Sequence, residues 1–369
     1  MPHLSRKPCL LFLTTLVFTL PVYSQELEEG RPKGLPLNAD GDEKDVTGWT
    51  IHFDNDLLIP GSRDQDYTGG LGITVAGSAV RDAWWSLDGL LGIINRATGF
   101  EQLADSPYRL HAAQFGLLVF SPSDISSHQS IYDDRPFANL IYMANSRRYI
   151  NTASDAVYQS TFTLGVLGTD IGADIQNGIH KLVGSQPPEG WDHQISAGGE
   201  PTFQYSVNRQ ALLASNFQAS RTEYELKYTA AGSVGYITEM NLSLGGRWGL
   251  LNTPWWSFTP ENADYASQPA PVIGNAAIGE AANELYVWGG IKLRARLYNA
   301  FLQGQFRDSD VTFSSGDIRH LVGEAWVGIT GQRKADRISY VIRFQTKEIK
   351  EGTGARDPVW AGFIFSHDM

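Results

Sequence analysis

Apolar and polar residues alternate along most of the chain after Trp49. The stretches at 222–232 and 289–301 show the alternation most clearly, and similar stretches lie at 160–168 and 338–349. A period of two residues is typical of a β-strand with one apolar and one polar face. About a dozen strand-sized segments can be counted, so the pattern predicts an all-β chain of half-apolar strands.

The alternation also predicts the two faces of individual strands. In a closed barrel that spans a membrane, the charged face would line the interior, because an arginine that faces lipid near the midplane costs about 2 to 4 kcal/mol. The apolar face would meet lipid. The interior would then receive Glu223, Glu225, Lys227, Lys292, Arg294 and Arg296, and the outer face would carry Tyr224, Leu226, Leu293 and Leu297.

Alternation alone also fits a soluble β-sandwich, since both architectures have one apolar face per strand. The first residues help to choose between them. Arg6 and Lys7 precede an apolar run that is too short to span a bilayer and that contains Cys9, the only cysteine. This pattern predicts a secretory signal at residues 1–24, so the mature chain is expected to leave the cytoplasm and to contain no cysteine.

Composition favours the membrane barrel. The chain has 29 Lys and Arg, two of them in the predicted signal, so 27 basic residues remain against 40 acidic ones and the net charge is −13. Such a chain is a poor partner for nucleic acid. The 38 Gly, 10 Trp, 15 Tyr and 17 Phe, with only 19% charged residues, suit a barrel wall with aromatic girdles. We therefore predict a transmembrane antiparallel β-barrel of about 12 strands in the bacterial outer membrane, formed by residues 47–369, with short helices outside the wall.

Two segments in the first third of the chain interrupt the strand pattern. Residues 25–46 are polar and rich in Gly and Pro, which predicts a lead-in segment before the barrel. Residues 82–104 carry apolar side chains at mixed helical spacing. We expect them to form a helix or a long loop outside the barrel.

A third interruption, at residues 169–185, predicts an amphipathic helix. Its apolar residues recur at spacings of four, four and three. Gln176 and His180 are four residues apart, so they share one face of this helix. The apolar positions are Ile171, Ile175, Ile179 and Leu182.

An acidic hairpin at residues 53–70 is the first candidate for chemistry. Hard oxygen ligands gathered at a turn suit Ca²⁺, although the spacing matches neither an EF-hand nor a phosphate-binding loop. The same residue types would also occur in an ordinary solvated turn. The oxygen-bearing side chains that flank the turn are Asn55, Asp56, Asp64, Asp66 and Thr68.

Five motifs in a fixed order cover nearly the whole predicted mature chain. They read NDLLIPGSRDQDYTGG, FSPSDI, YDDRPFANLIY, ADIQNGIHKLVGSQPPEGWDHQ and ISYVIRFQTKEI. In this order they resemble the outer-membrane lipid A 3′-O-deacylase (LpxR) family. The resemblance implies a twelve-stranded barrel, a hydrolytic site near its outer end, a requirement for Ca²⁺, and lipid A of lipopolysaccharide as substrate. We expect such a barrel to be a monomer.

The resemblance also implies roles for individual residues. His180 would be the general base that activates a water. Asp56 would hold Ca²⁺, which polarises the ester carbonyl. Asn55 and Thr68 would complete the hydrogen bonding around the site, and Arg135 in the third motif would bind substrate.

The chain departs from the family pattern at several positions. Phe137 and Asn139 stand where that pattern has Tyr and Gly, and the run before Glu200 is altered. Residues 82–104 lengthen an early loop. These departures keep a second hypothesis open, a non-catalytic outer-membrane barrel that serves as a channel or structural protein. A phospholipase with a Ser-His pair at 128–130 is a third hypothesis, which no orienting carboxamide supports.

Overall fold

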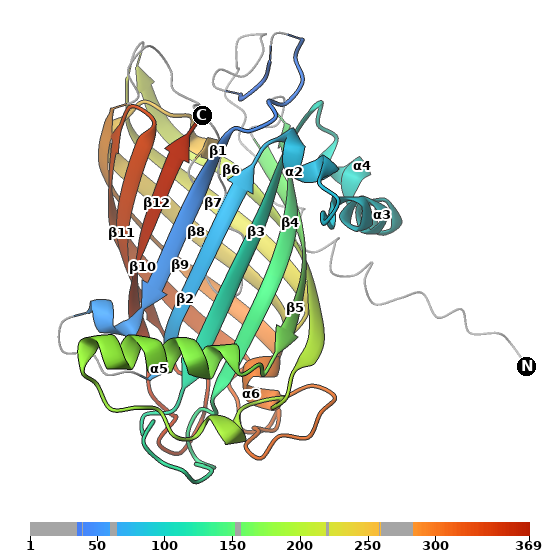
Figure 1. The fold of residues 1–369 in the computed structure, drawn as a ribbon. Coiled ribbons are helices and arrows are strands. Elements are labelled where there is room, and N and C mark those ends of the chain that lie inside the picture. The colour runs from blue at the N-terminus through green and yellow to red at the C-terminus, as the bar shows by residue number, and fades with distance from the viewer. Residues whose placement is uncertain are drawn as a thin grey trace, which may run out of the picture.

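The strands form one closed antiparallel barrel (Figure 1). The first strand pairs with both the second and the last, so the sheet has no open edge. This confirms the predicted transmembrane barrel. The predicted signal peptide and Asp64 lie outside the described residues. The computed structural model describes residues 35–38, 40–59, 65–151, 156–218, 221–257, 259 and 283–369.

The wall contains twelve strands within the described residues, and each pairs with its neighbours in sequence. They are β1 (Gly48–Asn55), β2 (Asp66–Ala76), β3 (Tyr108–Ser121), β4 (Ala138–Asn151), β5 (Ala156–Leu167), β6 (Glu200–Gln218), β7 (Arg221–Gly235), β8 (Ile237–Leu251), β9 (Glu284–Asn299), β10 (Leu321–Arg333), β11 (Asp336–Gln345) and β12 (Val359–Asp368).

Short helices lie between the strands, as predicted for residues 82–104 and 169–185. None of the helices in the described ranges is long and apolar enough to cross a membrane. They are the 3₁₀ turns η1 (Asp56–Leu58), η2 (Trp191–His193) and η3 (Trp255–Ser257), and the α-helices α2 (Ser78–Asp82), α3 (Asp88–Thr98), α4 (Phe100–Ala104), α5 (Ile171–Val183) and α6 (Ala300–Gln303).

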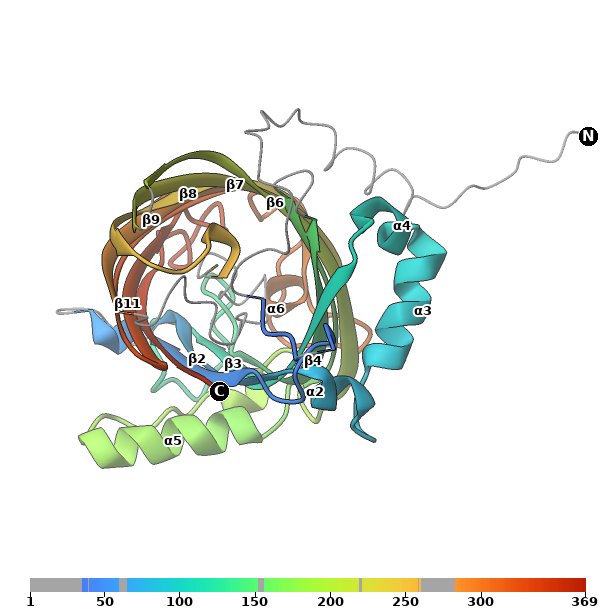
Figure 2. The same ribbon diagram turned by 90° about the horizontal axis from the view of Figure 1, so that it is seen from above.

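The two ends of the barrel differ. One end contains the start of β1 and the end of β12. There the Met369 backbone N–H donates to the Thr47 carbonyl at 2.9 Å. We call this the terminus end; α2, α3 and α4 lie outside the wall there (Figures 1 and 2). The opposite end, the loop end, carries η1, α6 and α5, and α5 lies across the outside of the wall.

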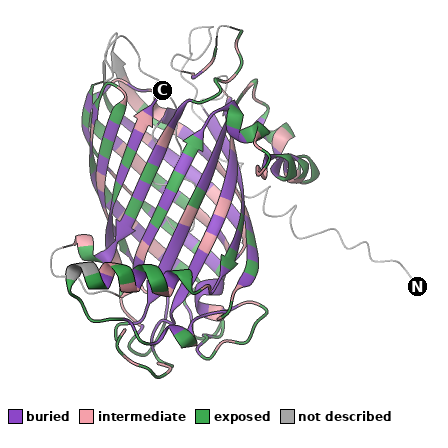
Figure 3. Cartoon of the chain, in the orientation of Figure 1, coloured by how far each residue is buried: buried purple, intermediate pink, exposed green. Residues whose placement is uncertain are grey.

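Buried and exposed residues alternate along the strands, as the coloured bands on the wall show (Figure 3). Arg294 is 0% exposed inside the barrel, whereas Leu297 on the same strand is 66% exposed outside. The predicted faces are therefore confirmed for these strands, with one exception. Glu223 is exposed, because the β7–β8 register shifts between Thr222 and Tyr224 and breaks the alternation near the end of β7.

The inward charges neutralise one another in a continuous series of ion pairs. Five acidic and five basic side chains alternate from the loop end into the interior. Buried charges are tolerated only when each has a partner, so the series makes a polar interior compatible with a folded barrel. In order, its members are Asp134, Arg356, Asp66, Arg135, Glu348, Arg296, Glu239, Arg294, Glu324 and Arg343.

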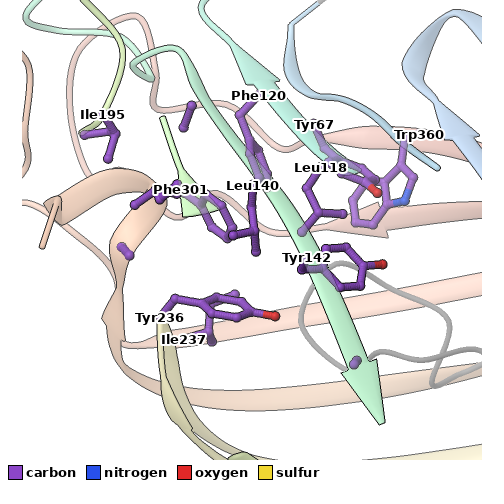
Figure 4. Close-up of a cluster of buried hydrophobic side chains, with 14 residues drawn as sticks. Tyr67, Leu118, Phe120, Leu140, Tyr142, Ile195, Tyr236, Ile237, Phe301 and Trp360 are labelled. Carbon is purple, nitrogen blue, oxygen red and sulfur yellow. The ribbon is translucent and has the colours of Figure 1, made fainter. Parts of the chain in front are cut away.

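An apolar cluster lies in the interior beside this series (Figure 4). Phe301 of α6 packs on Phe120 of β3, with ring centroids 4.6 Å apart. Tyr67 lies between Phe120 and Trp360, 5.4 Å from each ring. Asn299 caps α6 by accepting a hydrogen bond from the Phe301 backbone, which fixes the helix in the mouth of the barrel.

Candidate functional site

The hairpin of β1, η1 and β2 brings Asn55, Asp56 and Thr68 together at the loop end. The Asn55 carboxamide nitrogen donates to the Thr68 carbonyl at 2.8 Å, and its oxygen caps η1 by accepting from the Leu57 backbone at 2.7 Å. Asp56 is buried and accepts from the Gln65 backbone at 2.7 Å. These bonds join the three predicted residues in one turn in which all three are buried, and their roles in the site remain predictions.

Strand alternation directs this turn toward the outside of the wall. Ile51 and Phe53 are exposed on the outer face of β1, and Asn55 is the next residue on that face. The Thr68 hydroxyl is hydrogen-bonded to that of Ser121, which continues the outer face of β3 after Leu117 and Val119. The candidate site therefore lies at the outer rim of the barrel and not in its lumen.

Helix α5 covers the adjoining part of the outer wall. Leu117 and Val119 of β3 pack with Phe137 and Trp191, and Ala173 of α5 packs against the same cluster. Phe137 and Trp191 are in ring contact, with centroids 4.8 Å apart. From this seat on β3 and β4, α5 runs toward the side of the barrel that carries η1 (Figures 1 and 2).

The polar face of α5 is turned inward. Gln176 and His180 are 3% and 4% exposed, whereas Ile171 and Ile175 are 48% and 40% exposed. The Gln176 side-chain oxygen accepts a hydrogen bond from the Trp191 indole at 2.9 Å. The helix thus buries the two residues that share a face in the sequence and leaves Ile171 and Ile175 exposed.

The hydrogen bond of His180 determines its tautomer. Its Nδ1 faces the backbone carbonyl of Gln186, which can only accept, so Nδ1 carries the proton. In the neutral ring Nε2 then bears the lone pair. A ring fixed in this way is suited to remove a proton from a water at Nε2. Direct contact between His180 and the turn at Asn55, Asp56 and Thr68 remains a prediction.

Arg135 lies on the other side of the rim, inside the mouth of the barrel. Its guanidinium is 3.4 Å from Asp66, forms an ion pair with Glu348 and lies over the Phe120 ring. Arg135 is 3% exposed. Arg135 therefore belongs to the ion-pair series, between Asp66 and Glu348. Its role in substrate binding remains a prediction.

The last loop of the barrel supplies two residues that sequence reasoning missed. Arg356 donates to Asp66 at 2.8 Å and to Asp134 at 2.7 Å, and Glu348 pairs with Arg135. Both lie in the β11–β12 connection, far along the chain from the hairpin. No local motif marks them, because only the closed barrel brings this loop beside β2.

The surroundings lower the pKa of two carboxylates of this mouth, Asp134 and Glu348. Burial raises the pKa of Asp134, but hydrogen bonds from the Ser123 hydroxyl and backbone and the charge of Arg356 outweigh it, so the pKa lies below its ordinary value. Burial also opposes ionisation of Glu348. There the charges of Arg135 and Arg296 prevail and lower the pKa.

The departures from the family pattern have structural explanations. Asn139 donates to the Thr169 carbonyl and to the Gln194 side chain, both at 2.7 Å, and so fastens the segments before and after α5. Glu200 accepts from Ser196 at 2.6 Å and from the Phe306 backbone at 2.7 Å. Both residues stabilise the loops that carry the site.

The turn offers oxygen ligands for a metal. Among the described residues, no group of three or more His, Cys, Asp or Glu side chains could hold an ion. Ca²⁺ also accepts amide, hydroxyl and water oxygens, so the buried carboxylate of Asp56 in one turn with Asn55 and Thr68 would suit an ion that takes its other ligands from solvent or substrate. Asp56 is the residue that would hold it.

The Ser-His pair gains no support. The His128 side chain is 76% exposed in its loop and lies 3.8 Å from Glu189. Its backbone carbonyl contacts His193, which joins two loops. We find no arrangement around Ser130 in the described residues that would orient a histidine toward its hydroxyl.

Known proteins share this architecture. The family model described as Outer membrane protein LpxR matches residues 10–368. The structure of LpxR from Salmonella typhimurium has a TM-score of 0.67 and 17% sequence identity, and the match covers 88% of this chain and 100% of that one. This likeness shows a shared fold.

Other solved structures are more distant, and no curated protein sequence matches the chain. The β domain of the Bordetella autotransporter BrkA has a TM-score of 0.39 and 9% identity over 88% of this chain and 98% of that one. An outer membrane channel from Pseudomonas putida F1 has a TM-score of 0.40 and 8% identity over 93% and 100%. Scores this low support no inference about function.

Proposed function

This chain belongs to the LpxR family of outer membrane proteins, and from that membership and the rim site we propose that it is a Ca²⁺-dependent esterase. Its substrate would be lipid A of lipopolysaccharide, from which it removes a 3′-O-linked acyl group. Bacterial barrels have short periplasmic turns and longer outer loops, so the loop end would face outside, beside the leaflet that holds lipid A. We expect the enzyme to act as a monomer.

One observation carries the proposal. His180 is buried on the barrel-facing side of α5, and its Nδ1 donates to a backbone carbonyl. Any buried imidazole needs a partner for its N–H, and here the partner leaves Nε2 in the proton-accepting form that a general base requires. The site outside the wall is also where an acyl chain in the membrane can reach it.

The reaction is an ester hydrolysis. His180 Nε2 would take a proton from a water, and the oxygen of that water would add to the ester carbonyl. When bound at Asp56, Ca²⁺ would stabilise the negative charge on the carbonyl oxygen. The protonated histidine would then donate to the departing sugar oxygen, which leaves a hydroxyl on lipid A and releases a fatty acid.

The buried amide and hydroxyl groups would hold the reacting parts in place. Asn55 fixes the backbone of Thr68, and Thr68 pairs with Ser121 through its hydroxyl. Groups preorganised in this way lower the barrier because they do not have to reorient during the reaction. Gln176 would assist by anchoring α5 through Trp191.

The alternative of a channel has less support. The described interior contains the ion-pair series and the apolar cluster around Phe301, and α6 lies within the mouth (Figures 2 and 4). A porin-type barrel keeps a water-filled lumen instead.

Mass spectrometry of lipid A tests the proposal directly. Lipid A from cells that express the protein should lose the mass of one 3′-linked acyl chain, and lipid A from matched cells with an empty vector should not. Unchanged lipid A in the presence of folded protein and Ca²⁺ would contradict the proposal.

A further inference from the structure

A helical segment at the terminus end exposes an apolar surface. It comprises α2, α3 and α4, residues 78–104, and lies outside the wall (Figures 1 and 2). Trp84 is 95% exposed, and Ile93 on α3 is 57% exposed. Leu90 and Leu103 are 45% and 40% exposed.

The opposite side of α3 faces the barrel and carries buried polar residues together with Leu91. Asp88 forms an ion pair with Arg147 of β4, and the Asn95 side chain bonds to Tyr149 at 3.1 Å and to Ser160 at 2.8 Å. Asp88 and Asn95 are 2% and 0% exposed. A helix on a water-soluble protein packs most of its large apolar residues inward, whereas α3 buries Leu91 but leaves Leu90 and Ile93 exposed.

This arrangement has a physical reason if lipid surrounds the helix. Arg147 and Tyr149 lie on the outer face of β4, where lipid would otherwise meet them. Polar groups in hydrocarbon need partners, and α3 supplies them. Its apolar side can then face acyl chains without loss, whereas in water the same side would be an exposed hydrophobic patch.

The apolar surface of the segment is continuous with the membrane-facing wall. Trp85 contacts Phe115 of β3, with ring centroids 5.2 Å apart, and Phe115 is 48% exposed on the outer face of that strand. Arg81 and Arg96 are exposed at the ends of α2 and α3. Aromatic side chains with nearby cations are typical of the boundary between acyl chains and phosphate head groups.

We propose that residues 78–104 form a lipid-embedded anchor, in which the apolar side of α3 lies among phospholipid acyl chains of the periplasmic leaflet. The occupant of this surface is the phospholipid leaflet itself. The anchor does not depend on the esterase activity, since it lies at the opposite end of the barrel from the rim site.

Spin labels on single cysteines test this anchor. Cys9 is the only cysteine in the sequence, so a Cys9→Ser background accepts one label at a time. Ile93→Cys is the test position. Ile291→Cys on the outer wall is the lipid-facing reference, and Glu351→Cys in the exposed β11–β12 loop is the water-facing reference.

The measurement is the collision rate of each label with oxygen, which concentrates in lipid, and with a water-soluble nickel chelate. The proteins are folded into vesicles of phosphatidylethanolamine and phosphatidylglycerol, and heat-modifiable gel mobility confirms that each variant is folded. We expect the ratio of the oxygen rate to the nickel rate at residue 93 to exceed that at residue 351 several-fold and to approach that at residue 291, which lies deeper in the wall.

Two results would overturn the proposal. A ratio at residue 93 equal to that at residue 351 would place α3 in water. Low collision rates with both reagents, which rise as the protein is diluted in lipid, would show that a second copy of the chain covers the helix.

Discussion

The Arg356 guanidinium donates from Nε to the Asp66 carboxylate at 2.8 Å, and so ties the last loop of the barrel to the start of β2. Asp66 has φ of +66°, a left-handed conformation that costs a non-glycine residue on the order of 1 kcal/mol. The β2–β3 register shifts directly after it, between Asp66 and Gly69. Within that bulge Tyr67 packs into the lumen, and the Thr68 hydroxyl meets Ser121.

The ion pair between Arg356 and Asp66 should affect the rate of catalysis because it holds Thr68 in its place in the site. Arg356→Gln removes the nearer of the two charges that hold Asp66, so the bulge can relax and Thr68 can move from its place in the site. We expect kcat for deacylation to fall about 10- to 100-fold, as misplacement by roughly 1 Å can produce. The barrel should remain folded by heat-modifiable mobility, and Arg333→Gln at an exposed strand end should leave kcat unchanged. Full activity of Arg356→Gln would show that the pair only stabilises the mouth.

The metal prediction concerns Asp56. Asp56→Asn keeps the size of the side chain but removes one charged oxygen ligand, so the affinity for Ca²⁺ should fall about tenfold or more. Terbium luminescence and calorimetric titration with Ca²⁺ measure this without reference to activity. Asp124→Asn, an exposed acid in a neighbouring loop, is the control. Equal affinity in both variants would mean that the ion binds elsewhere or not at all.

The contact between His193 and Asp310, which joins the β5–β6 loop to the β9–β10 loop, should be stronger at low pH. His193 of η2 bonds to Asp310 at 2.5 Å, and this bond, aided by the His128 carbonyl, raises the pKa of His193. A raised pKa in the folded state stabilises the protein below the pKa of about 6.5 in the unfolded chain, and the effect disappears as the pH rises through the folded value.

Thermal unfolding at two pH values measures this contribution. Asp310→Asn should lower the midpoint by about 1 to 3 °C at pH 5.5, since the pair is partly exposed, and should have little effect at pH 8.5. Asp308→Asn, exposed and two residues away, should change neither. The same loss at both pH values would show that the ionised histidine does not contribute.

The barrel was predictable because strand alternation is a local signal. Arg294 and Leu297 obey it since they lie in the regular middle of the wall. Glu223 does not, because the register between β7 and β8 shifts between Thr222 and Tyr224 and changes the direction of its side chain. Sequence patterns of one strand contain no information about such a shift.

The site was only partly predictable for the same reason. Asn55, Asp56 and Thr68 are close in sequence, and one hairpin unites them. Arg356 and Asp66 are 290 residues apart, and no motif connects them before the barrel closes. The periodicity of α5 predicted the helix, but it could not show that Ile171 and Ile175 would stay exposed, because periodicity does not say whether water or lipid surrounds a helix.

The hydrolase proposal depends most on His180. The ring is buried, its Nδ1 proton is committed to the Gln186 carbonyl, and its helix packs on the outer wall beside the strands that carry Thr68 and Ser121. As the general base it should contribute on the order of 10² to 10⁴ in rate. His180→Ala should therefore release almost no fatty acid from lipid A.

His180→Gln distinguishes the base from a packing residue. Glutamine fills much of the same space and can donate to the Gln186 carbonyl, so it should preserve the helix, yet its amide cannot accept the proton. We expect a folded, heat-modifiable protein that retains Ca²⁺ affinity and has lost activity as fully as His180→Ala. Gln176→Ala serves as the comparison, since it removes the bond to Trp191 but leaves the base, and it should lower the rate less. Fatty-acid release, Ca²⁺ titration and gel mobility on the same purified proteins separate these roles, and a well-folded, fully active His180→Gln variant would refute the proposed hydrolysis at this site.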